Sequence, residues 1–226
     1  MTMKRIVLLM LSLALLAPSA KLGAQTLETL KARKALVKET KSALNARASK
    51  DARKEAKRLS KDGWQVPPGT LPLEKQLDRV YLMQYEFDEN MYPKYILGDA
   101  TSIGENYDAA KFQAMELAKV SLASQIETEV TGLIDTEMAN MQLSAGEAAS
   151  VSKTTAGLKS LLTQKIGRVL VPVECFRTLQ NKNKEVRVMI AYDSQTALEQ
   201  AKSLIREQLA AESAELVSKL DGVIGK

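Results

Sequence analysis

Two alternating segments near the carboxyl-terminal end restrict the fold more than any other feature of this sequence. Each segment places an apolar side chain at every second residue, a period that predicts a β-strand. The polar stretch between them, residues 180–184, is short and rich in Asn, so we expect the strands to pair as an antiparallel hairpin. The alternating residues are Val169, Val171, Val173 and Cys175 in the first strand and Val186, Val188, Ile190 and Tyr192 in the second.

Another strand and a long helix are predicted upstream of the hairpin. Residues 95–103 have the pattern of a strand, which ends in a turn at residues 104–106. Apolar residues then recur at steps of three and four, which is typical of a helix with one side in a core. After Met138 the sequence becomes small and polar, so the helix either breaks there or continues as a second one to Leu162, and we favour a break. The periodic residues are Ala118, Leu122, Ile126, Val130 and Leu133.

The hairpin is followed by the pattern of a last helix. Asp193 or Ser194 can cap its first turn through a side-chain oxygen. The order strand, helix, strand, strand, helix predicts an α+β fold, in which a small antiparallel three-stranded sheet carries helices on one face. The apolar side of the last helix, which is expected to end near Leu220, consists of Leu198, Ala201, Ile205, Leu209 and Leu216.

A long basic helix is predicted in front of this domain. Residues 26–61 contain no Gly or Pro and are rich in Ala, Lys, Arg and Leu, which are strong helix formers. Residues 27–62 hold twelve Lys and Arg against five Asp and Glu, whereas the sequence after residue 62 is net acidic. Leu30, Val37 and Leu44 form only a narrow apolar seam at heptad spacing, so we expect a solvated, self-associating or loosely docked arm.

Helix-breaking residues divide the arm from the domain. Gly63 and the Pro67-Pro68-Gly69 run mark a linker. A short helix from Pro72 to about Gln84 is expected to cap the core. The predicted division is a signal peptide at 1–24, a basic helical arm at 25–62, a linker and capping helix at 63–94, and the α+β domain at 95–226.

The first 24 residues have the layout of a secretory signal peptide. Lys4 and Arg5 precede the largely apolar run Ile6 to Leu16, and small residues follow up to Ala24. The run is about 11 residues long, and a helix needs roughly 20 to span a membrane. We therefore expect cleavage after Ala24, or alternatively after Ala20, and export to the periplasm or outer envelope without a transmembrane segment in the mature chain.

The residue types that most catalytic sites need are missing from the sequence. The chain has no histidine, which removes Ser-His-Asp and Cys-His catalysis and zinc binding by histidine. No phosphate-binding or dinucleotide-binding glycine motif occurs. The single cysteine, Cys175, can neither form an internal disulfide nor carry a lipid at the cleavage point, so we expect it to be buried. These absences predict that the protein is not an enzyme and has no cofactor.

An acidic and aromatic stretch between Tyr85 and Tyr95 is the one candidate for a metal site. It includes Glu86, Asp88 and Glu89, whose oxygens suit a hard cation. The stretch lacks the ligand spacing and the turn glycine of a calcium loop. We therefore expect a polar loop that holds no metal.

The basic face of the arm is the candidate binding surface. Its residues suit an anionic partner, and for an exported protein we expect anionic lipid head groups or acidic wall polymers rather than nucleic acid. The alternative is a solvated helix that its charges keep soluble. The candidate contact residues are Arg47, Lys50, Lys54, Lys57 and Arg58.

A family resemblance is carried by a strand that contains a glycine, a helix with recurring alanines, and the closing hairpin: Ile96-Leu97-Gly98-Asp99-Ala100, then Ala110, Ala114 and Ala118 before Leu122 to Val130, then residues 169–192. With these features residues 95–218 resemble the twenty-kilodalton outer-envelope lipoprotein family, also called Lpp-twenty. The resemblance implies a dodecin-like α+β domain, surface or periplasmic placement, and neither enzymatic activity nor a defined cofactor. The chain departs from the family pattern because it lacks the lipidated cysteine.

Taken together, these features predict an exported, non-enzymatic interaction or assembly module of the bacterial cell envelope. The expected partner is an envelope protein or a second copy of the chain, with the arm docking to the envelope. The alternative is a periplasmic small-molecule or ion-binding protein. It would use a pocket between the sheet and the helices, with residues 85–99 at its mouth.

Overall fold

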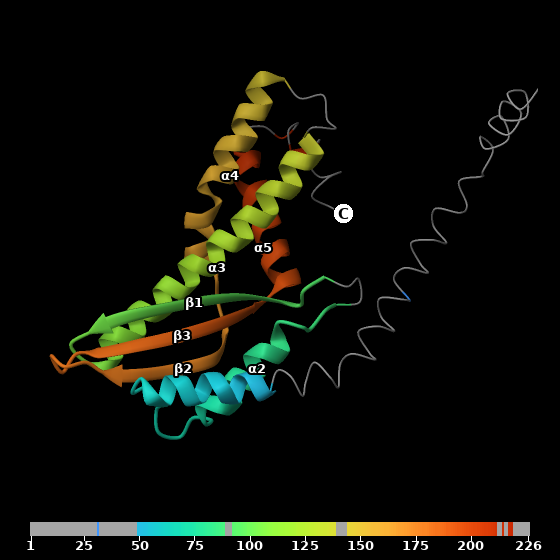
Figure 1. The fold of residues 1–226 in the computed structure, drawn as a ribbon. Coiled ribbons are helices and arrows are strands. Elements are labelled where there is room, and N and C mark those ends of the chain that lie inside the picture. Colours follow the sequence, from blue (N-terminus) through green and yellow to red (C-terminus); the bar gives the residue numbers. More distant parts are fainter. Residues whose placement is uncertain are drawn as a thin grey trace, which may run out of the picture.

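The computed structural model describes residues 31, 49–88, 92–138, 144–211, 214, 217 and 218. Within these residues the chain has an α+β fold with a three-stranded antiparallel sheet (Figure 1). The predicted signal peptide, the apolar seam at Leu30, Val37 and Leu44, and the predicted helix end near Leu220 lie outside the described residues.

The sheet consists of β1 (Tyr95–Gly104), β2 (Leu170–Thr178) and β3 (Lys184–Asp193), in the order β1-β3-β2. β2 and β3 form the predicted antiparallel hairpin, and β1 pairs antiparallel with the other side of β3. β3 therefore lies at the centre of the sheet. Its alternating residues Val186, Val188 and Ile190 are fully buried, as their period of two predicts.

The first half of β2 departs from a simple alternation. The pairing of β2 with β3 shifts between Leu170 and Val173, which is the mark of a β-bulge or a similar irregularity. As a result Val171 is 40% exposed, whereas Val173 and Cys175 are buried. The predicted alternation therefore holds only in the second half of this strand.

Three helices lie on one side of the sheet: α3 (Tyr107–Met138), α4 (Ala145–Lys165) and α5 (Ser194–Ala210). The helix does break after Met138, but a second helix, α4, follows the break up to Lys165, which is the alternative that the sequence analysis did not favour. α4 begins with a capping box in which Ser144 and Glu147 bond each other's backbone N–H. The observed order is strand, helix, helix, strand, strand, helix, and it differs from the predicted order by the addition of α4.

Side-chain oxygens cap the other helices of this layer. The Oδ1 atom of Asn106 accepts a hydrogen bond from the backbone N–H of Ala109 at 2.9 Å, in the first turn of α3. Asp193 caps α5, as the sequence predicts, and its Oδ1 atom accepts a hydrogen bond from the N–H of Thr196 at 2.9 Å. These bonds cap α3 just after β1 and α5 just after β3.

The larger of two apolar clusters lies between the sheet and these helices. The alanines Ala110, Ala114 and Ala118 bring α3 very close to β1, and all three are fully buried. A Cβ atom placed on Gly98 would lie 2.4 Å from the carbonyl oxygen of Ala118, so only glycine fits there. The small residues that carried the family resemblance thus serve the contact between helix and strand.

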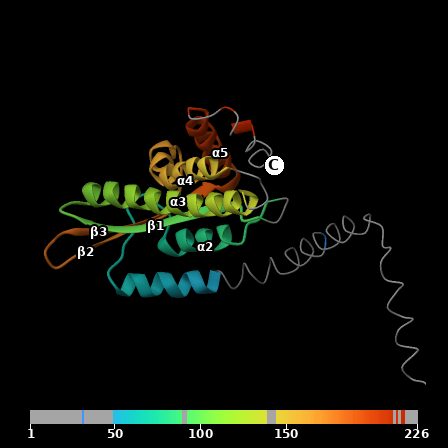
Figure 2. The same ribbon diagram turned by 90° about the horizontal axis from the view of Figure 1, so that it is seen from above.

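Helices also cover the opposite face of the sheet, so the prediction of helices on one face is wrong. Residues 49–61 form a helix that packs there together with α2 (Leu73–Met83) (Figure 2). Their apolar residues form the second cluster with Val173 and Cys175 of β2. A sheet with Cys175 facing one way and the neighbouring Phe176 facing the other has apolar side chains to bury on both faces. The helical members of this cluster are Ala52, Ala56, Leu59, Leu73, Leu77 and Val80.

Within the described residues, none of the helices has the length and apolar character needed to cross a lipid bilayer. α2 agrees with the predicted short helix in its bounds and in the burial of Leu73, Leu77 and Val80. The described end of the arm is docked on the sheet rather than solvated, because Ala52, Ala56 and Leu59 are at most 8% exposed.

Candidate anionic-partner surface

One side of the helix formed by residues 49–61 carries a row of lysines, here called the lysine stripe. An α-helix turns by about 100° per residue, so residues at steps of four, three and four fall within an arc of about 60°. The buried alanines and Leu59 lie on the opposite side of the helix. The lysine stripe consists of Lys50, Lys54, Lys57 and Lys61, all of them exposed.

Contacts along the helix hold the lysine stripe in a fixed orientation. Ser49 Oγ donates a hydrogen bond to Asp78 Oδ1 of α2 at 2.7 Å, and Arg53 pairs with Glu74 of α2 at 3.7 Å. Burial of Leu59 anchors the other end of the helix. The lysines therefore point away from the sheet because the opposite side of their helix is packed against α2 and β2.

The chain after the helix is tied to the sheet as well. Trp64 is buried, and the guanidinium group of Arg177 lies 5.0 Å from the centre of its indole ring. Gln65 exchanges two backbone hydrogen bonds with Phe176 of β2, at 2.7 and 2.8 Å. The predicted linker thus contributes Trp64 to the core and Gln65 to the edge of the sheet.

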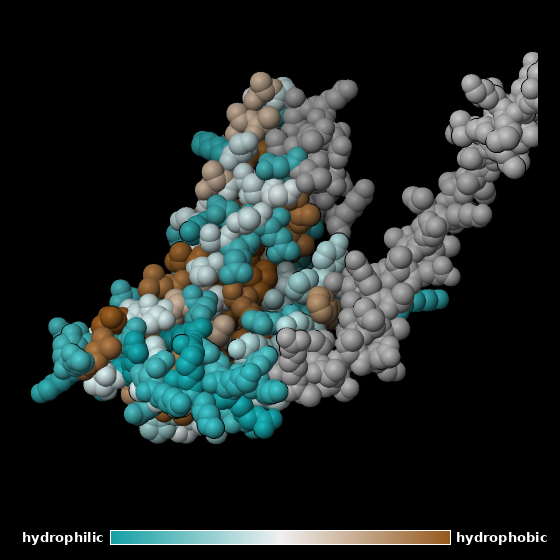
Figure 3. Space-filling view, viewed as in Figure 1, coloured by the Kyte–Doolittle hydropathy of each residue, from teal (hydrophilic) through white to brown (hydrophobic). Residues whose placement is uncertain are grey.

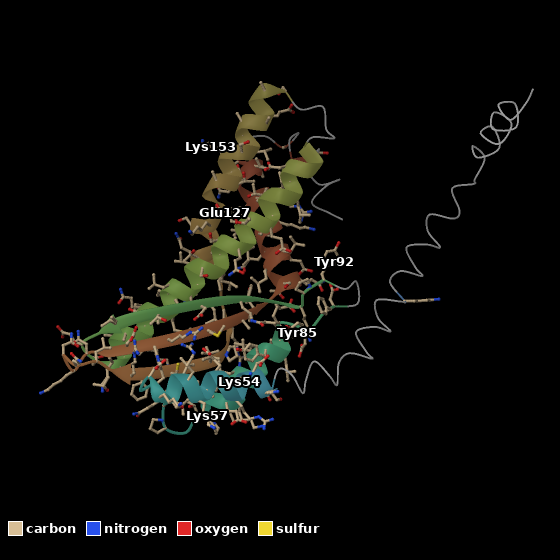
Figure 4. All side chains as sticks on the ribbon, viewed as in Figure 1. Lys54, Lys57, Tyr85, Tyr92, Glu127 and Lys153 are labelled. Carbon is tan, nitrogen blue, oxygen red and sulfur yellow. The ribbon has the colours of Figure 1, made fainter. Side chains whose placement is uncertain are left out.

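The structure separates the predicted contact residues into three groups. Lys50, Lys54 and Lys57 lie on the lysine stripe, and Figure 4 shows Lys54 and Lys57 on the side of the sheet opposite α3. Arg47 lies outside the described residues. Arg58 donates two hydrogen bonds to Glu55, at 2.6 and 2.9 Å, and lies 3.8 Å from Asp62, so its charge is already balanced within the helix.

The Arg58–Glu55 pair also changes the pKa of the Glu55 carboxyl group. The hydrogen bond from Arg58 lowers the pKa of Glu55 below its usual value, so this carboxylate stays ionised and keeps its partner. Within the described residues, no carboxylate pairs with a lysine of the stripe. The stripe therefore presents four positive charges that no carboxylate of the described part of the chain pairs with, and Figure 3 shows hydrophilic residues gathered over this region.

Lys61 was missed by the sequence analysis although the sequence contained the signal. It follows Lys57 by four residues, the same step that separates Lys50 from Lys54. Helical periodicity applied to the whole arm would have included Lys61 and excluded Arg58, which lies off the row. The sequence also carried the signal that Arg58 is paired, because Glu55 and Asp62 lie three residues before it and four residues after it, the spacings at which helix side chains meet.

A second polar cluster lies between α3 and β2. Tyr107 donates its hydroxyl hydrogen to Glu174, and Lys111 lies 2.8 Å from the same carboxylate oxygen. Burial, followed by the hydrogen bond to Glu174, raises the pKa of Tyr107 well above its usual value, so the phenol stays protonated. The T-shaped contact of Tyr107 with Phe176 adds packing to these bonds. The cluster thus joins a helix to a strand.

The candidate metal loop uses its carboxylates for other bonds. Glu86 pairs with Lys94 at 3.8 Å, and Asp88 Oδ1 accepts a hydrogen bond from the backbone N–H of Tyr92 at 2.9 Å. Glu89 lies outside the described residues. No group of three or more potential metal ligands of the His, Cys, Asp and Glu type occurs within the part of the chain that the structure describes.

An open groove of about 590 Å³ lies between β1 and α3, near the region named in the alternative hypothesis. Ser194, the first residue of α5, contributes a buried hydroxyl that has no hydrogen-bond partner within the described residues. The groove mixes apolar and polar groups without a cluster of charges. Its lining residues are Gln84, Pro93, Tyr95, Ile96, Leu97, Ser124, Gln125, Thr128, Glu129 and Ser194.

Comparisons of the chain with protein-family models, with curated proteins and with solved structures find no match. The resemblance of residues 95–218 to the twenty-kilodalton lipoprotein family therefore stays a prediction. What the chain binds has to be inferred from the placement of its charges and hydrogen-bonding groups.

Proposed function

We propose that this chain is a non-enzymatic binding module of the bacterial cell envelope, which docks on an anionic surface through the lysine stripe. The observation that carries the proposal is the row of four exposed lysines, which have no ion-pair partner among the described residues, on a helix whose other side is buried. The predicted signal peptide and the lipoprotein resemblance support placement in the envelope.

The spacing of the lysine stripe suits a partner with repeated negative charges. The stripe is about 16 Å long, because eleven residue steps of about 1.5 Å separate its ends. Each lysine near an anionic membrane surface contributes about 1 kcal/mol, so four give about 4 kcal/mol, which corresponds to a dissociation constant in the millimolar range. Binding by the stripe alone is thus reversible, and the remaining basic residues of the arm would strengthen it.

Vesicle co-sedimentation of the mature chain, from residue 25 to residue 226, tests this proposal. We expect binding to vesicles that contain an anionic phospholipid and little binding to zwitterionic vesicles. Replacing the four lysines of the stripe by Gln should lower the affinity about a thousandfold, the equivalent of about 4 kcal/mol. The matched control removes four positive charges elsewhere by the substitutions K153Q, K165Q, R168Q and K182Q.

The control variant decides whether position or net charge matters. The proposal predicts that the control keeps most of the binding, because its charges lie outside the stripe. Equal losses in the two variants would show that only net charge counts and would contradict the lysine stripe as a site. Equal binding of the unaltered chain to both kinds of vesicle would contradict the choice of an anionic surface.

The groove between β1 and α3 favours a second candidate function, binding of a small molecule or an ion in the envelope. The hydroxyl of Ser194, which has no partner in the described part of the chain, and the side chains of Ser124 and Thr128 offer polar contacts beside Leu97. A thermal-shift screen with metabolites and divalent ions tests this candidate. A ligand that raises the melting temperature of the unaltered chain, but not of a Ser124→Leu variant, would support it.

A further inference from the structure

The outer edge of β1 carries hydrogen-bonding groups that no neighbouring strand uses. In an antiparallel pair, successive residues point their N–H and C=O groups alternately toward the partner strand and away from it. Just beyond the β1–β3 ladder, the N–H of Ser194 donates to the carbonyl oxygen of Lys94 at 2.9 Å. Even-numbered residues of β1 therefore face β3. The groups of residues 95, 97, 99, 101 and 103 point away from the sheet.

The side chain of Gln125 confirms this direction and marks how open the edge is. Its Nε2 atom donates to the carbonyl oxygen of Leu97 at 2.8 Å. Within the described residues, this is the one hydrogen bond made by the outward groups of β1. A row of five backbone amides and five carbonyls is thus almost entirely available to another chain.

The opposite edge of the sheet is closed. On β2, the outward groups of Phe176 bond with the backbone of Gln65, and the N–H of Glu174 donates to Gln76 Oε1 at 2.8 Å. Proteins commonly protect sheet edges in this way, because an open edge recruits other strands. The chain protects β2 and leaves β1 unprotected.

α3 extends over the open edge. Figure 1 shows α3 crossing the sheet obliquely and continuing past β1. The groove of about 590 Å³ lies at this point, with residues 95–97 of β1 on one side. The other side is formed by α3, through Ser124, Gln125, Thr128 and Glu129. A strand added beside β1 would run along this groove and under the helix.

The geometry points to a docking site for an extended peptide segment of a partner protein, which adds to the sheet as a fourth strand beside β1. In β-strand addition the main-chain hydrogen bonds supply affinity, and pockets for alternate side chains supply specificity. The site lies at the edge of the sheet away from β2, whereas the lysine stripe lies on the helix packed against β2. The inference therefore goes beyond the anionic docking proposed above and does not depend on it.

The two faces of the added strand would meet different chemistry. Side chains that face α3 would meet Ser124 and Thr128, and also the exposed carboxylate of Glu129, which has no ion-pair partner within the described residues. Small polar residues and one Lys or Arg suit that side. Side chains on the other face would lie beside Leu97 and Ile103, of which Ile103 is 51% exposed, so Val, Ile or Leu suits that side.

Asp99 also lies on β1, but its carboxylate does not change the expected preference of the peptide for one cation. Arg187 holds it through two hydrogen bonds, at 3.1 and 2.6 Å. Its charge is therefore already compensated. The unpaired Glu129 is the group that selects a cation in the peptide.

A second copy of the chain fits this edge less well than a peptide. Neighbouring strands lie about 4.8 Å apart, whereas packed helices need about 8–10 Å between their axes. Pairing of β1 with its copy would bring two α3 helices over the same edge. An extended segment carries no helix with it and avoids this conflict.

Selection from a library of random ten-residue peptides displayed on phage, with the mature chain as bait, tests the inference. We expect enrichment of sequences that alternate Val, Ile or Leu with small polar residues and carry one Lys or Arg on the polar side. Binding of a fluorescent copy of a selected peptide is then measured by anisotropy. Thr101→Pro removes one outward N–H without breaking a bond to β3, and should weaken binding about tenfold or more.

Two further variants make the outcome specific. Thr101→Val keeps the backbone N–H and should bind the peptide as the unaltered chain does. Replacing the four lysines of the stripe by Gln should also leave peptide binding unchanged, which separates this site from the anionic surface. Equal binding of the peptide to the Thr101→Pro variant would overturn strand addition, and so would a library that yields no peptide.

Hydrogen exchange provides an independent readout of the same site. In the free chain the amides of Leu97, Asp99 and Thr101 should exchange much faster than those of Gly98 and Ala100, which face β3. Peptide binding should slow the fast set. Slowing of the fast set by raised protein concentration alone, without peptide, would identify a second copy as the strand donor and overturn the inference.

Discussion

Gly98 shows how closely α3 approaches the sheet. A Cβ atom at this position would lie 2.4 Å from a backbone oxygen of Ala118, and a backbone atom cannot move aside as a flexible side chain can. The alanines of α3 and the glycines of β1 therefore form one contact between two segments that are separate in the sequence. The sequence showed the small residues, but their partners emerge only when the helix lies on the strand.

Gly98→Ala should destabilise the fold by about 1–3 kcal/mol or more, because the added methyl group forces α3 away from β1. The free energy of unfolding is measured by urea denaturation. Gly157→Ala is the matched control, since nothing lies within 4 Å of its Cβ position on α4. The control should stabilise by about 0.5–1 kcal/mol because alanine favours a helix. Similar effects of the two changes would contradict the close contact at Gly98.

The thiol of Cys175 is expected to be unreactive in the folded chain. It is fully buried, and burial raises its pKa to about 12, so the thiol stays protonated at pH 8. A thiol reagent should therefore modify it slowly at pH 8 in the native state and at once in denaturant. Rapid labelling of the folded chain would show that the helix of residues 49–61 does not cover β2 in solution.

At the scale of elements, the strands were easier to predict than the helical layers. The period of two in Val186, Val188 and Ile190 predicted β3 and the face of it that is buried. The capping residue Asp193 predicted where α5 begins. α4 was harder, since its apolar residues are few and its first turn is small and polar. Its start depends on the reciprocal bonds of Ser144 and Glu147.

Ser144→Ala should shorten or weaken α4. The substitution removes the side-chain acceptor of the capping box and should cost about 1 kcal/mol of stability. Ser152→Ala, on the exposed side of the same helix, serves as the control and should change stability by less than about 0.5 kcal/mol. Circular dichroism during thermal unfolding measures both. Equal melting temperatures of the two variants would argue against the cap.

The second helical layer was missed because its signal lies in residues that read as part of the arm. Ala52, Ala56 and Leu59 recur at steps of four and three, but two of them are alanines, which every exposed helix also contains. On the sheet, Arg187 and Met189 alternate on the face that this layer covers, so a charged side chain stands among its apolar residues. Asp99 neutralises the charge of Arg187 by an ion pair beside the second apolar cluster.

At the scale of the whole molecule, the sheet lies between two helical layers, and both contribute to one folded unit. Residues 49–61 and α2 form one layer, and α3, α4 and α5 form the other (Figure 2). The boundary predicted at residue 62, between the arm and the linker, therefore lies beside a shared apolar cluster that includes Leu59 and Trp64. The basic character of the arm and its burial on the sheet are separate properties of opposite sides of one helix.

Leu59→Ala tests whether the arm helix belongs to the folded unit. Leu59 is 4% exposed in the second cluster, and loss of such a side chain costs about 2–5 kcal/mol. We expect a single unfolding transition at lower denaturant concentration. Leu71→Ala is the control, because Leu71 is 55% exposed and should matter little. An unchanged midpoint for Leu59→Ala would show that the helix docks weakly.

The closed edge at β2 and the open edge at β1 have a consequence for how many occupants the module can hold. The open edge belongs to β1, whereas the lysine stripe lies on the helix packed against β2, so neither occupant should block the other. A peptide at β1 and an anionic surface at the lysine stripe should therefore form a ternary complex whose two affinities are nearly independent. The chain would then act as an adaptor that recruits a protein to a charged surface without changing its own shape.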